Sequence, residues 1–222
     1  MDRLKDKVAI VTGSTSGIGI GIARLFAAEG AKVVICGRRQ EKGQAVVDEI
    51  AKDGGETYYH FMDITDTDSI DKLMADTVEK YGKIDVLVNN AANVGLKDGR
   101  VDELTIEMWD AVFNSDMRGT FYTTKCVLPY MTKNETGGSI INIGSMASCG
   151  GDLGSTAYAC AKAGVDMLSL IKEYKLPARF PEDVVTEAKS FGNKIDMKDA
   201  KNRVDLRDRI VFTIDGEEAK DL

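Results

Sequence analysis

The segment from Val8 to Gly19, VAIVTGSTSGIG, indicates the fold class of the chain. It starts with four apolar residues, which is typical of a short buried strand, and continues into the apolar spacing of a helix. Glycines at that junction permit a tight turn and a close approach of the backbone to a phosphate, next to the N–H groups of the helix N-terminus. The segment therefore predicts a dinucleotide-binding loop made of Gly13, Ser14, Thr15, Ser16, Gly17, Ile18 and Gly19. The alternative is that the glycines only mark a strand-to-helix turn.

The same alternation of short apolar runs and helical spacing continues along the chain. We expect strands at residues 8–11, 33–36, 57–62, 85–88 and 139–143. We expect helices at residues 18–29, 41–52, 66–81, 105–131 and 156–172. Strands that alternate with helices indicate βαβ units, a parallel sheet, and helices on both faces of that sheet. The predicted fold is an α/β, Rossmann-like doubly wound parallel sheet in three layers.

The composition of the 222 residues excludes several classes of protein. The net charge of −7 and the pI of about 4.9 are unsuited to a protein that binds nucleic acid or an anionic membrane. No apolar run of about 18 residues is present, and the N-terminal residues lack a signal-peptide core. The four cysteines form no C-x-x-C pair. We therefore expect a cytoplasmic protein with reduced thiols, no nucleic-acid or membrane partner, and no metal.

Two arginines stand at the end of the second expected strand, in the order Cys36-Gly37-Arg38-Arg39. In a dinucleotide site, an acidic residue at this place bonds the ribose hydroxyls of NAD. Guanidinium groups there suit the additional 2′-phosphate of NADP. Arg38 and Arg39 therefore favour NADP(H) over NAD(H); the alternative is that they are solvated surface charges.

Tyr158 and Lys162 lie four residues apart on an expected helix, so their side chains share one face. An ammonium beside a phenol stabilises the phenolate, which makes the tyrosine a usable acid and base nearer neutral pH. A surface pair is the alternative for these common residues. Ser145 follows the fifth strand, at the sheet edge where open α/β sheets bind ligands, and its hydroxyl could hold a carbonyl oxygen.

These motifs, in this order, resemble the short-chain dehydrogenase/reductase family over residues 1 to about 170. The matching positions are the glycine loop from Thr12 to Gly19, Asp63 after the third strand and Asn89-Asn90-Ala91 after the fourth. Asn114 in the long helix, Ser145, and Tyr158 with Lys162 complete the set. The resemblance implies an oxidoreductase that transfers a hydride between a nicotinamide cofactor and a small alcohol or carbonyl substrate.

The resemblance also implies a role for each matching residue. Tyr158 exchanges a proton with the substrate oxygen, Lys162 supports Tyr158 and bonds the nicotinamide ribose, and Ser145 orients the carbonyl. Asn114 holds a water in a proton relay through Lys162. Asp63 bonds the adenine amino group, and the adenosine side of the cleft is lined by Ile64, Asn90 and Ala91. Members of the family often form dimers or tetramers, so a homo-oligomer is possible.

Two small departures from the family pattern concern the backbone. Ala92 replaces a glycine of the family motif N-N-A-G, which is tolerable where φ is negative. Gly144 replaces the first serine of the family pair before the active site, and Ser145 is retained.

The larger departure is in the C-terminal segment. Of residues 171–222, 23 are charged, against 42 of residues 1–170. The family's last two strands, its Pro-Gly turn and its substrate-covering loop have no counterpart there. We expect the missing strands to belong beside the first strand, and their loss to leave an apolar edge, which residues 210–214 could cover as a substitute strand. The expected organisation is a dehydrogenase domain at 1–170 and a charged extension at 171–222.

The end of the chain, TIDGEEAKDL, resembles the entry to the catalytic domain of ribonuclease R and ribonuclease II. Asp215 and Asp221 match the first two acids of that family's metal site, and the remaining two are absent, so no nuclease activity is expected. The sequence thus allows three hypotheses: an NADP(H)-dependent oxidoreductase, a cofactor-binding but catalytically impaired chimera joined near residues 169–172, and a fragment of an RNA-processing protein. The alternating charges of the extension and the missing acids argue against the third.

Overall fold

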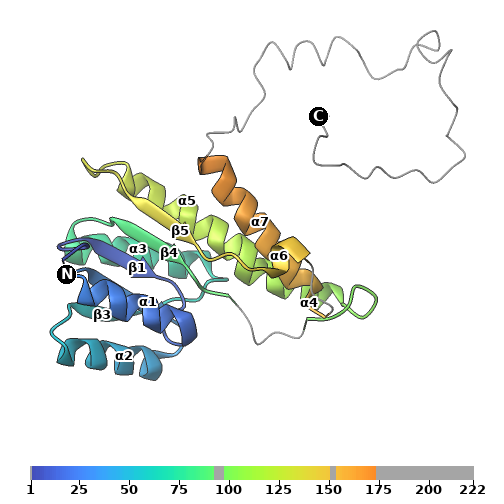
Figure 1. The fold of residues 1–222 in the computed structure, drawn as a ribbon, viewed down its shortest axis with the longest axis horizontal. Helices are drawn as coiled ribbons and strands as arrows, with labels where there is room; N and C mark the ends of the chain where they lie inside the picture. Colours follow the sequence, from blue (N-terminus) through green and yellow to red (C-terminus); the bar gives the residue numbers. More distant parts are fainter. Residues whose placement is uncertain (1, 93–97, 151–153, 174–222) are drawn as a thin grey trace, which may run out of the picture. The chain divides into compact units, whose positions relative to one another are not determined.

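The computed structural model describes residues 2–92, 98–150 and 154–173 (Figure 1). In chain order the elements are β1 (Val8–Val11), α1 (Gly17–Ala28), β2 (Lys32–Gly37), α2 (Gln40–Lys52), β3 (Thr57–Phe61), α3 (Thr67–Tyr81), β4 (Val86–Asn89), α4 (Ile106–Val112), the π-helix η1 (Phe113–Arg118), α5 (Gly119–Met131), β5 (Ser139–Asn142), α6 (Ala147–Gly150) and α7 (Thr156–Glu173). The predicted extension, including Asp215 and Asp221, lies outside these residues except for the end of α7.

The strands form one parallel sheet in the order β3-β2-β1-β4-β5. The predicted α/β, Rossmann-like fold is therefore confirmed. The chain runs outward from β1 through β2 to β3, returns to β4 on the other side of β1, and continues to β5. This return creates the switch point at which ligands bind in sheets of this kind, outside the carboxyl ends of β1 and β4.

The expectation that further strands belong beside the first strand is wrong. Both sides of β1 are occupied, by β2 and by β4. The edges of the described sheet are β3 and β5, and on β5 the side chain of Ile141 is 42% exposed. The open edge at β5 therefore lies two strands away from β1.

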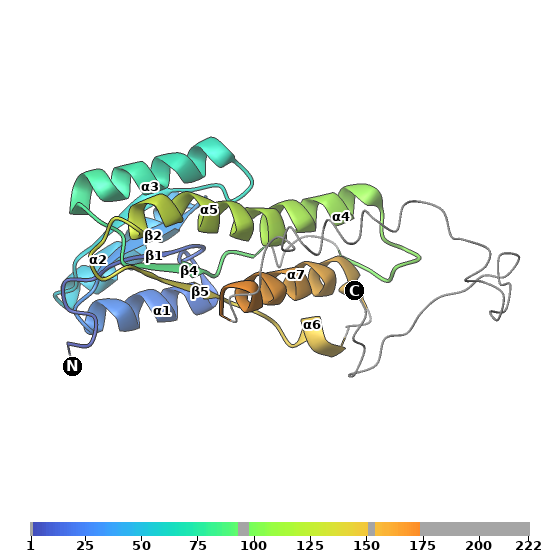
Figure 2. The ribbon, with the colours of Figure 1, turned by 90° about the horizontal axis from the view of Figure 1, so that it is seen from above.

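Helices cover both faces of the sheet, as Figure 2 shows from above. Alternate residues of β1 and β2 face α1 and α2, where Val11 and Ile35 pack with Ala23 and Ile50. The opposite face packs on α3 and α5, and its largest fully buried side chains include Ile10, Leu73 and Leu87. The four residues of β1 are all buried, and all four are apolar, because a strand that is covered on both faces needs apolar residues at every position. This double burial explains why the central strands β1, β2 and β4 could be found from short apolar runs.

The predicted helix at 105–131 is interrupted. It begins as α4, widens into η1 at Phe113–Arg118, and continues as α5 to Met131. The short helix α6 was not predicted. Asp66 is the N-cap of α3, because its carboxylate accepts a hydrogen bond of 3.0 Å from the backbone N–H of Asp68.

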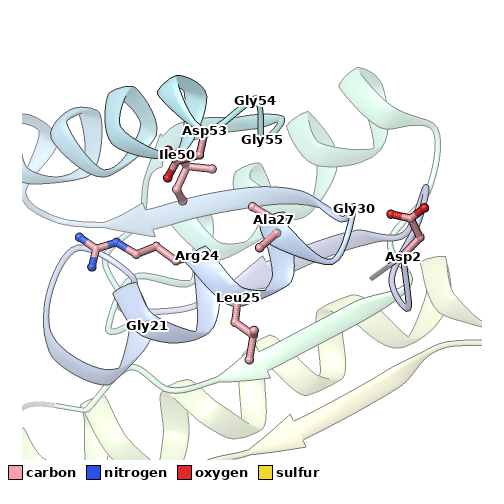
Figure 3. Close-up of a pocket in the computed structure, with 11 residues that line it drawn as sticks. Asp2, Gly21, Arg24, Leu25, Ala27, Gly30, Ile50, Asp53, Gly54 and Gly55 are labelled. Atoms are coloured by element: carbon pink, nitrogen blue, oxygen red, sulfur yellow. The ribbon is translucent and has the colours of Figure 1, made fainter.

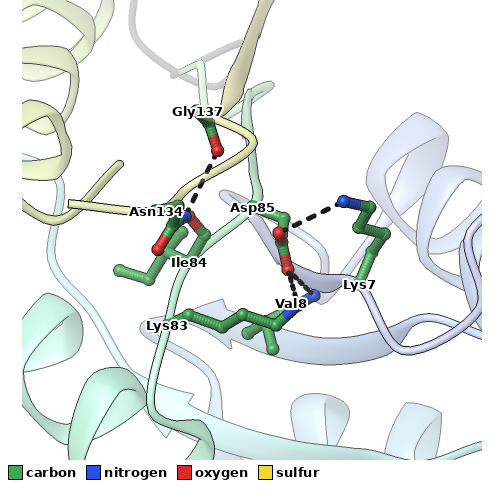
Figure 4. A network of polar contacts seen from close by, with 7 residues as sticks. All are labelled: Lys7, Val8, Lys83, Ile84, Asp85, Asn134 and Gly137. Carbon is green, nitrogen blue, oxygen red and sulfur yellow. Dashed lines mark hydrogen bonds and ion pairs between the residues drawn. The ribbon is translucent and has the colours of Figure 1, made fainter. Parts of the chain in front are cut away.

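A buried carboxylate fastens the amino ends of β1 and β4, opposite the ligand edge (Figure 4). Asp85 is 4% exposed and accepts a hydrogen bond of 2.8 Å from the backbone N–H of Val8. The ammonium groups of Lys83 and Lys7 lie 3.0 and 3.5 Å from its two oxygens. Burial raises the pKa of Asp85, but the Val8 N–H and the two lysines outweigh it, and the net pKa is below the ordinary value.

Candidate active site

An open cleft of about 760 Å³ lies at the carboxyl ends of the strands. It brings together most of the residues that the sequence predicted for the cofactor and the chemistry. The predicted residues that line it are Gly13, Thr15, Ser16, Gly17, Ile18, Arg38, Arg39, Asp63, Ile64, Asn90, Ala91, Ser145, Tyr158 and Lys162. Three predicted residues do not line it, namely Ser14, Gly19 and Asn114.

Backbone packing explains two of the glycines of the predicted loop. Gly13 has a φ of 68°, and a Cβ there would lie 2.9 Å from the Cα of Ala91. A Cβ on Gly19 would lie 2.7 Å from the Asn90 side-chain nitrogen. Both positions therefore let the loop after β1 press against the loop after β4, which glycine alone permits without strain.

Thr12 joins the same two loops through hydrogen bonds. The Thr12 hydroxyl oxygen accepts hydrogen bonds from the backbone N–H groups of Asn90 and Ala91, each at 2.9 Å. The side-chain amide of Asn90 donates to the Thr12 carbonyl oxygen at 2.9 Å. The predicted residue Ser14 is buried beneath the loop, where its hydroxyl donates to the carbonyl oxygen of Val11 at 2.7 Å and accepts from the N–H of Cys36 at 3.0 Å. Ser14 therefore shapes the loop from below.

The N-terminus of α1 opens into the cleft. Its N-cap residue, Ser16, makes no side-chain hydrogen bond to the helix. The Ser16 hydroxyl instead accepts a hydrogen bond of 2.7 Å from Arg39, which is exposed at the rim with Arg38. The cleft therefore offers helix N–H groups and guanidinium groups in one place, a combination suited to phosphate.

Asp63 lies on the cleft wall after β3. One oxygen of its carboxylate accepts hydrogen bonds from the backbone N–H and the hydroxyl of Thr65, at 2.9 and 2.8 Å. The Ser69 hydroxyl accepts from the backbone N–H of Asp63 at 3.0 Å. These contacts fix the direction of the carboxylate at the start of α3.

Tyr158, Lys162 and Ser145 all line the cleft. The Lys162 ammonium nitrogen lies 5.7 Å from the centre of the Tyr158 ring, so the two side chains share one face of α7 as predicted. Lys162 is 3% exposed, and its ammonium donates a hydrogen bond of 2.7 Å to the carbonyl oxygen of Ile143. The Ser145 hydroxyl oxygen accepts from the backbone N–H of Ala147 at 3.2 Å.

Burial lowers the pKa of Lys162, because removal from water disfavours the charged ammonium. The nearby carboxylates of Asp116 and Asp166 act in the opposite direction and raise the pKa of Lys162. The net pKa lies below the ordinary value of 10.5. The effect of burial on the pKa of Lys162 therefore outweighs that of the two carboxylates.

Comparison with known proteins agrees with this geometry. The family model described as short chain dehydrogenase matches residues 7–175. The chain belongs to the short chain dehydrogenase family. An uncharacterized oxidoreductase of Bacillus subtilis, YxbG, is 39% identical over 170 residues, which are 76% of this chain and 61% of that protein. The 3-oxoacyl-[acyl-carrier-protein] reductase FabG of Thermotoga maritima is 40% identical over 163 residues, which are 73% of this chain and 65% of that protein.

Solved structures of the same family superpose on the chain. A short chain dehydrogenase from Mycobacterium smegmatis has a TM-score of 0.74 and 35% identity, over 79% of this chain and 73% of that one. A variant of the actinorhodin polyketide ketoreductase, solved with NADPH, has a TM-score of 0.71 and 36% identity, over 77% of this chain and 65% of that one. The chain thus spans somewhat under two thirds of the length of the curated relatives given above.

The structure does not bring Asn114 to this cleft. Asn114 is exposed on η1, whereas its neighbour Ser115 lines the cleft and Asp116 is fully buried. Residues two apart on a helix point roughly 200° away from each other, so only one of Asn114 and Asp116 can face inward.

Sequence reasoning also missed Asp98. Its carboxylate accepts hydrogen bonds from the backbone N–H groups of Ala157 and Tyr158, at 3.1 and 2.8 Å, at the first turn of α7. A carboxylate at this place satisfies N–H groups that have no partner within the helix and interacts favourably with the helix dipole. Asp98 therefore fixes the backbone from which the Tyr158 side chain extends.

The backbone at Ala92 agrees with the expectation for this departure from the dehydrogenase motif. Among the described residues, Asp6 is the one non-glycine with a positive φ, at 59°. Ala92 therefore lines the cleft without the left-handed conformation that would require glycine.

A second hollow, of about 570 Å³, lies between α1 and α2 (Figure 3). Its lining combines glycines and apolar residues with Asp2, Arg24 and Asp53. The Arg24 guanidinium is engaged by Glu49. No residue predicted for the dehydrogenase chemistry lines this hollow. Within the described ranges, no group of three or more metal-ligating side chains occurs, and no helix has the length and apolar character needed to cross a membrane.

Proposed function

We propose that the chain is an NADP(H)-dependent oxidoreductase that interconverts an alcohol and a carbonyl compound. The observation that carries the proposal is that the glycine loop and the Tyr158–Lys162 pair line the same cleft. The named relatives support it, since one is a 3-oxoacyl reductase and another a polyketide ketoreductase solved with NADPH. A third relative is a 3beta-hydroxysteroid dehydrogenase, so the proposal extends to the class of carbonyl and alcohol substrates.

The residues at hand fit a nicotinamide dinucleotide. A Cβ on Gly13 or Gly19 would occupy the space in which the two loops approach, and the first turn of α1 presents uncapped N–H groups to the cleft. We assign the pyrophosphate to this turn, the adenosine to the wall with Asp63, Ile64, Asn90 and Ala91, and a 2′-phosphate to Arg38 and Arg39. When bound, the nicotinamide supplies or accepts the hydride.

The side chains of this chain supply the proton and the orientation. Tyr158 donates a proton to the substrate oxygen during reduction and takes it back during oxidation. Lys162, fixed by the Ile143 carbonyl, stabilises the phenolate that forms and bonds the nicotinamide ribose. The Ser145 hydroxyl oxygen already accepts from the Ala147 N–H, which leaves its own proton available to orient the substrate carbonyl.

Calorimetric titration of the purified chain with NADPH and with NADH tests the cofactor part of the proposal. We expect saturable binding that is tighter for NADPH. The Gly13→Ala variant is the negative control, because its new methyl group meets the Ala91 backbone. We expect this variant to bind neither cofactor. Absence of binding by the folded wild-type chain would overturn the proposal.

Turnover is tested next, by following oxidation of NADPH with a β-keto thioester, a β-keto ester and a ketosteroid. Consumption of NADPH that depends on the carbonyl compound supports the oxidoreductase. Tight NADPH binding with no turnover of any carbonyl class would restrict the function to cofactor binding.

A further inference from the structure

Tyr59 is a side chain of β3 that the mechanism above does not use, although it contacts the backbone of the cofactor cleft. Its hydroxyl donates a hydrogen bond of 2.6 Å to the carbonyl oxygen of Gly37, the last residue of β2. The same oxygen accepts a bond of 3.2 Å from the backbone N–H of Met62. Gly37 lines the cleft and opens the arginine turn, residues 37–40, which joins β2 to α2. Tyr59 therefore holds the first residue of this turn.

The ring of Tyr59 supports the other end of the arginine turn. It lies against the first turn of α2, where Gly43 is buried and donates its backbone N–H to the carbonyl oxygen of Arg39 at 2.9 Å. A Cβ on Gly43 would overlap the ring carbons of Tyr59. Glycine at position 43 therefore lets the start of α2 pack directly on the ring.

The opposite side of Gly37 faces the glycine loop. A Cβ on Gly37 would lie 3.0 Å from the hydroxyl oxygen of Thr15, which is 5% exposed and also lines the cleft. The Arg39 guanidinium donates to the hydroxyl of the next loop residue, Ser16, at 2.7 Å. Because these contacts are close, a shift of the Gly37 backbone would change the position of the arginines relative to the loop.

The neighbouring residue of β3, Tyr58, has no such contact with the cleft. Successive side chains of a strand point to opposite faces of the sheet. The Tyr58 hydroxyl lies 3.2 Å from that of Thr77 on α3, and Thr77 donates its own proton to the carbonyl oxygen of Leu73. Tyr58 and Tyr59 therefore each donate one hydrogen bond, on opposite faces of the sheet, and that of Tyr59 ends at a residue of the cleft.

We propose that Tyr59 is a positioning residue that holds Arg38 and Arg39 at the cleft and thereby sets the preference for a dinucleotide with a 2′-phosphate. One side chain fixes both ends of the arginine turn, through its hydroxyl at Gly37 and its ring at Gly43. The consequence for cofactor choice rests on the proposed function. The effect on the turn itself depends on neither cofactor nor substrate.

Proteolysis of the cofactor-free chain tests the positioning directly. Trypsin cleaves after arginine, and mass spectrometry follows the release of peptides that end at Arg38 or Arg39. Tyr59→Phe keeps the ring and loses one hydrogen bond, so the open form of the turn becomes more populated. We expect cleavage at these two sites to be about 3- to 10-fold faster, because the rate follows that population.

The matched control is Tyr58→Phe, which loses a hydrogen bond of the same strand on the other face. It should be cleaved after Arg38 and Arg39 at the wild-type rate. An unchanged rate in Tyr59→Phe would overturn the proposal. Equal acceleration in both variants would also overturn it, because the effect would then come from the overall stability of the chain.

Calorimetric titration measures the effect on cofactor choice. In Tyr59→Phe we expect NADPH affinity to fall by about 3- to 10-fold and NADH affinity to change by less than about twofold. Gly43→Ala tests the ring by a second route, because the added methyl group displaces the ring together with its hydroxyl. It should give the same selective loss of NADPH affinity. An equal loss of both affinities in Tyr59→Phe would mean a general loosening of the cleft and would contradict the proposed role.

Failure of this inference and failure of the oxidoreductase proposal give different results. A wild-type chain that binds neither cofactor, with faster cleavage in Tyr59→Phe, would refute the oxidoreductase and support the positioning of the turn. A wild-type chain that prefers NADPH, with the same ratio of affinities in Tyr59→Phe, would support the cofactor assignment and overturn the role of Tyr59.

Discussion

The Lys162 ammonium donates a hydrogen bond of 2.7 Å to the carbonyl oxygen of Ile143, directly after β5. This contact ties a side chain of α7 to the backbone at the carboxyl edge of the sheet. Because the lysine is buried and its nitrogen is held by a backbone atom, its distance from the Tyr158 ring is fixed before any ligand binds. The proposed acid–base pair is therefore preorganised by the fold.

Replacement of Tyr158 by Phe removes the proposed proton donor and keeps the ring. We expect turnover to fall by about 10²–10⁴-fold, the usual contribution of a general acid or base. NADPH affinity should change little, because the glycine loop and the arginines remain. Steady-state kinetics and a fluorescence titration with NADPH measure the two effects separately.

The matched control for this change is Tyr122→Phe. The Tyr122 hydroxyl is bonded to Asp71 on the exposed side of α5, away from the cleft. This variant should retain wild-type turnover. Retained reductase activity in Tyr158→Phe would refute the assignment of the proton donor.

The three central strands, β1, β2 and β4, could be predicted because they are buried on both faces. Val8–Val11 is buried at every position, so a continuous apolar run marks the strand without ambiguity. The cofactor loop could be predicted for a related reason. The contacts with Ala91 and Asn90 leave no room for a Cβ at positions 13 and 19, so the close approach of the two loops requires glycines that the sequence shows directly.

The inward face of the long helical segment could not be predicted. Regular helical spacing does not reveal the π-turn at Phe113–Arg118, and the amide of Asn114 suits the role that the family resemblance implies. The structure directs Asp116 inward and Asn114 outward. Asp98 was missed because its bond to α7 spans 60 residues of sequence, and no local pattern marks such a contact.

Removal of both arginines at the end of β2 should change the choice of cofactor. In the Arg38→Ala, Arg39→Ala double variant, a 2′-phosphate loses its charge-assisted hydrogen bonds, which are worth about 1.5–3 kcal/mol each. We expect NADPH binding to weaken by roughly 10²- to 10⁴-fold and NADH binding to stay nearly constant. Calorimetry with each cofactor measures the ratio.

The control is Arg118→Ala, an exposed arginine on η1 that does not line the cleft. It lowers the net charge of the chain without touching the proposed phosphate site. An equal loss of NADPH and NADH affinity in the double variant would contradict the assignment of the arginines to the 2′-phosphate.

Asp98→Ala should loosen the start of α7. The change removes both acceptors from the N–H groups of Ala157 and Tyr158, and loss of such a cap costs about 1 kcal/mol. Turnover should fall with little change in NADPH affinity, since Tyr158 loses its fixed backbone. Asp98→Asn keeps a capping oxygen and should restore most of the stability and the rate. Thermal unfolding and kinetics on the three proteins check this, and an Asn variant as impaired as the Ala variant would show that capping is not the cause.

Asp85→Asn should reveal how a buried carboxylate stabilises the amino end of the sheet. The folded-state pKa of Asp85 is held below its ordinary value of 3.8 by the Val8 N–H and the neighbouring lysines. A depressed pKa contributes stability that is fully present above 3.8 and is lost as the pH falls through the folded-state pKa. At neutral pH we expect the variant to lose about 1–3 kcal/mol of unfolding free energy. The difference between wild type and variant should shrink when both are unfolded with urea at successively lower pH. A difference that stays constant down to strongly acidic pH would mean that Asp85 acts through shape and not through its charge.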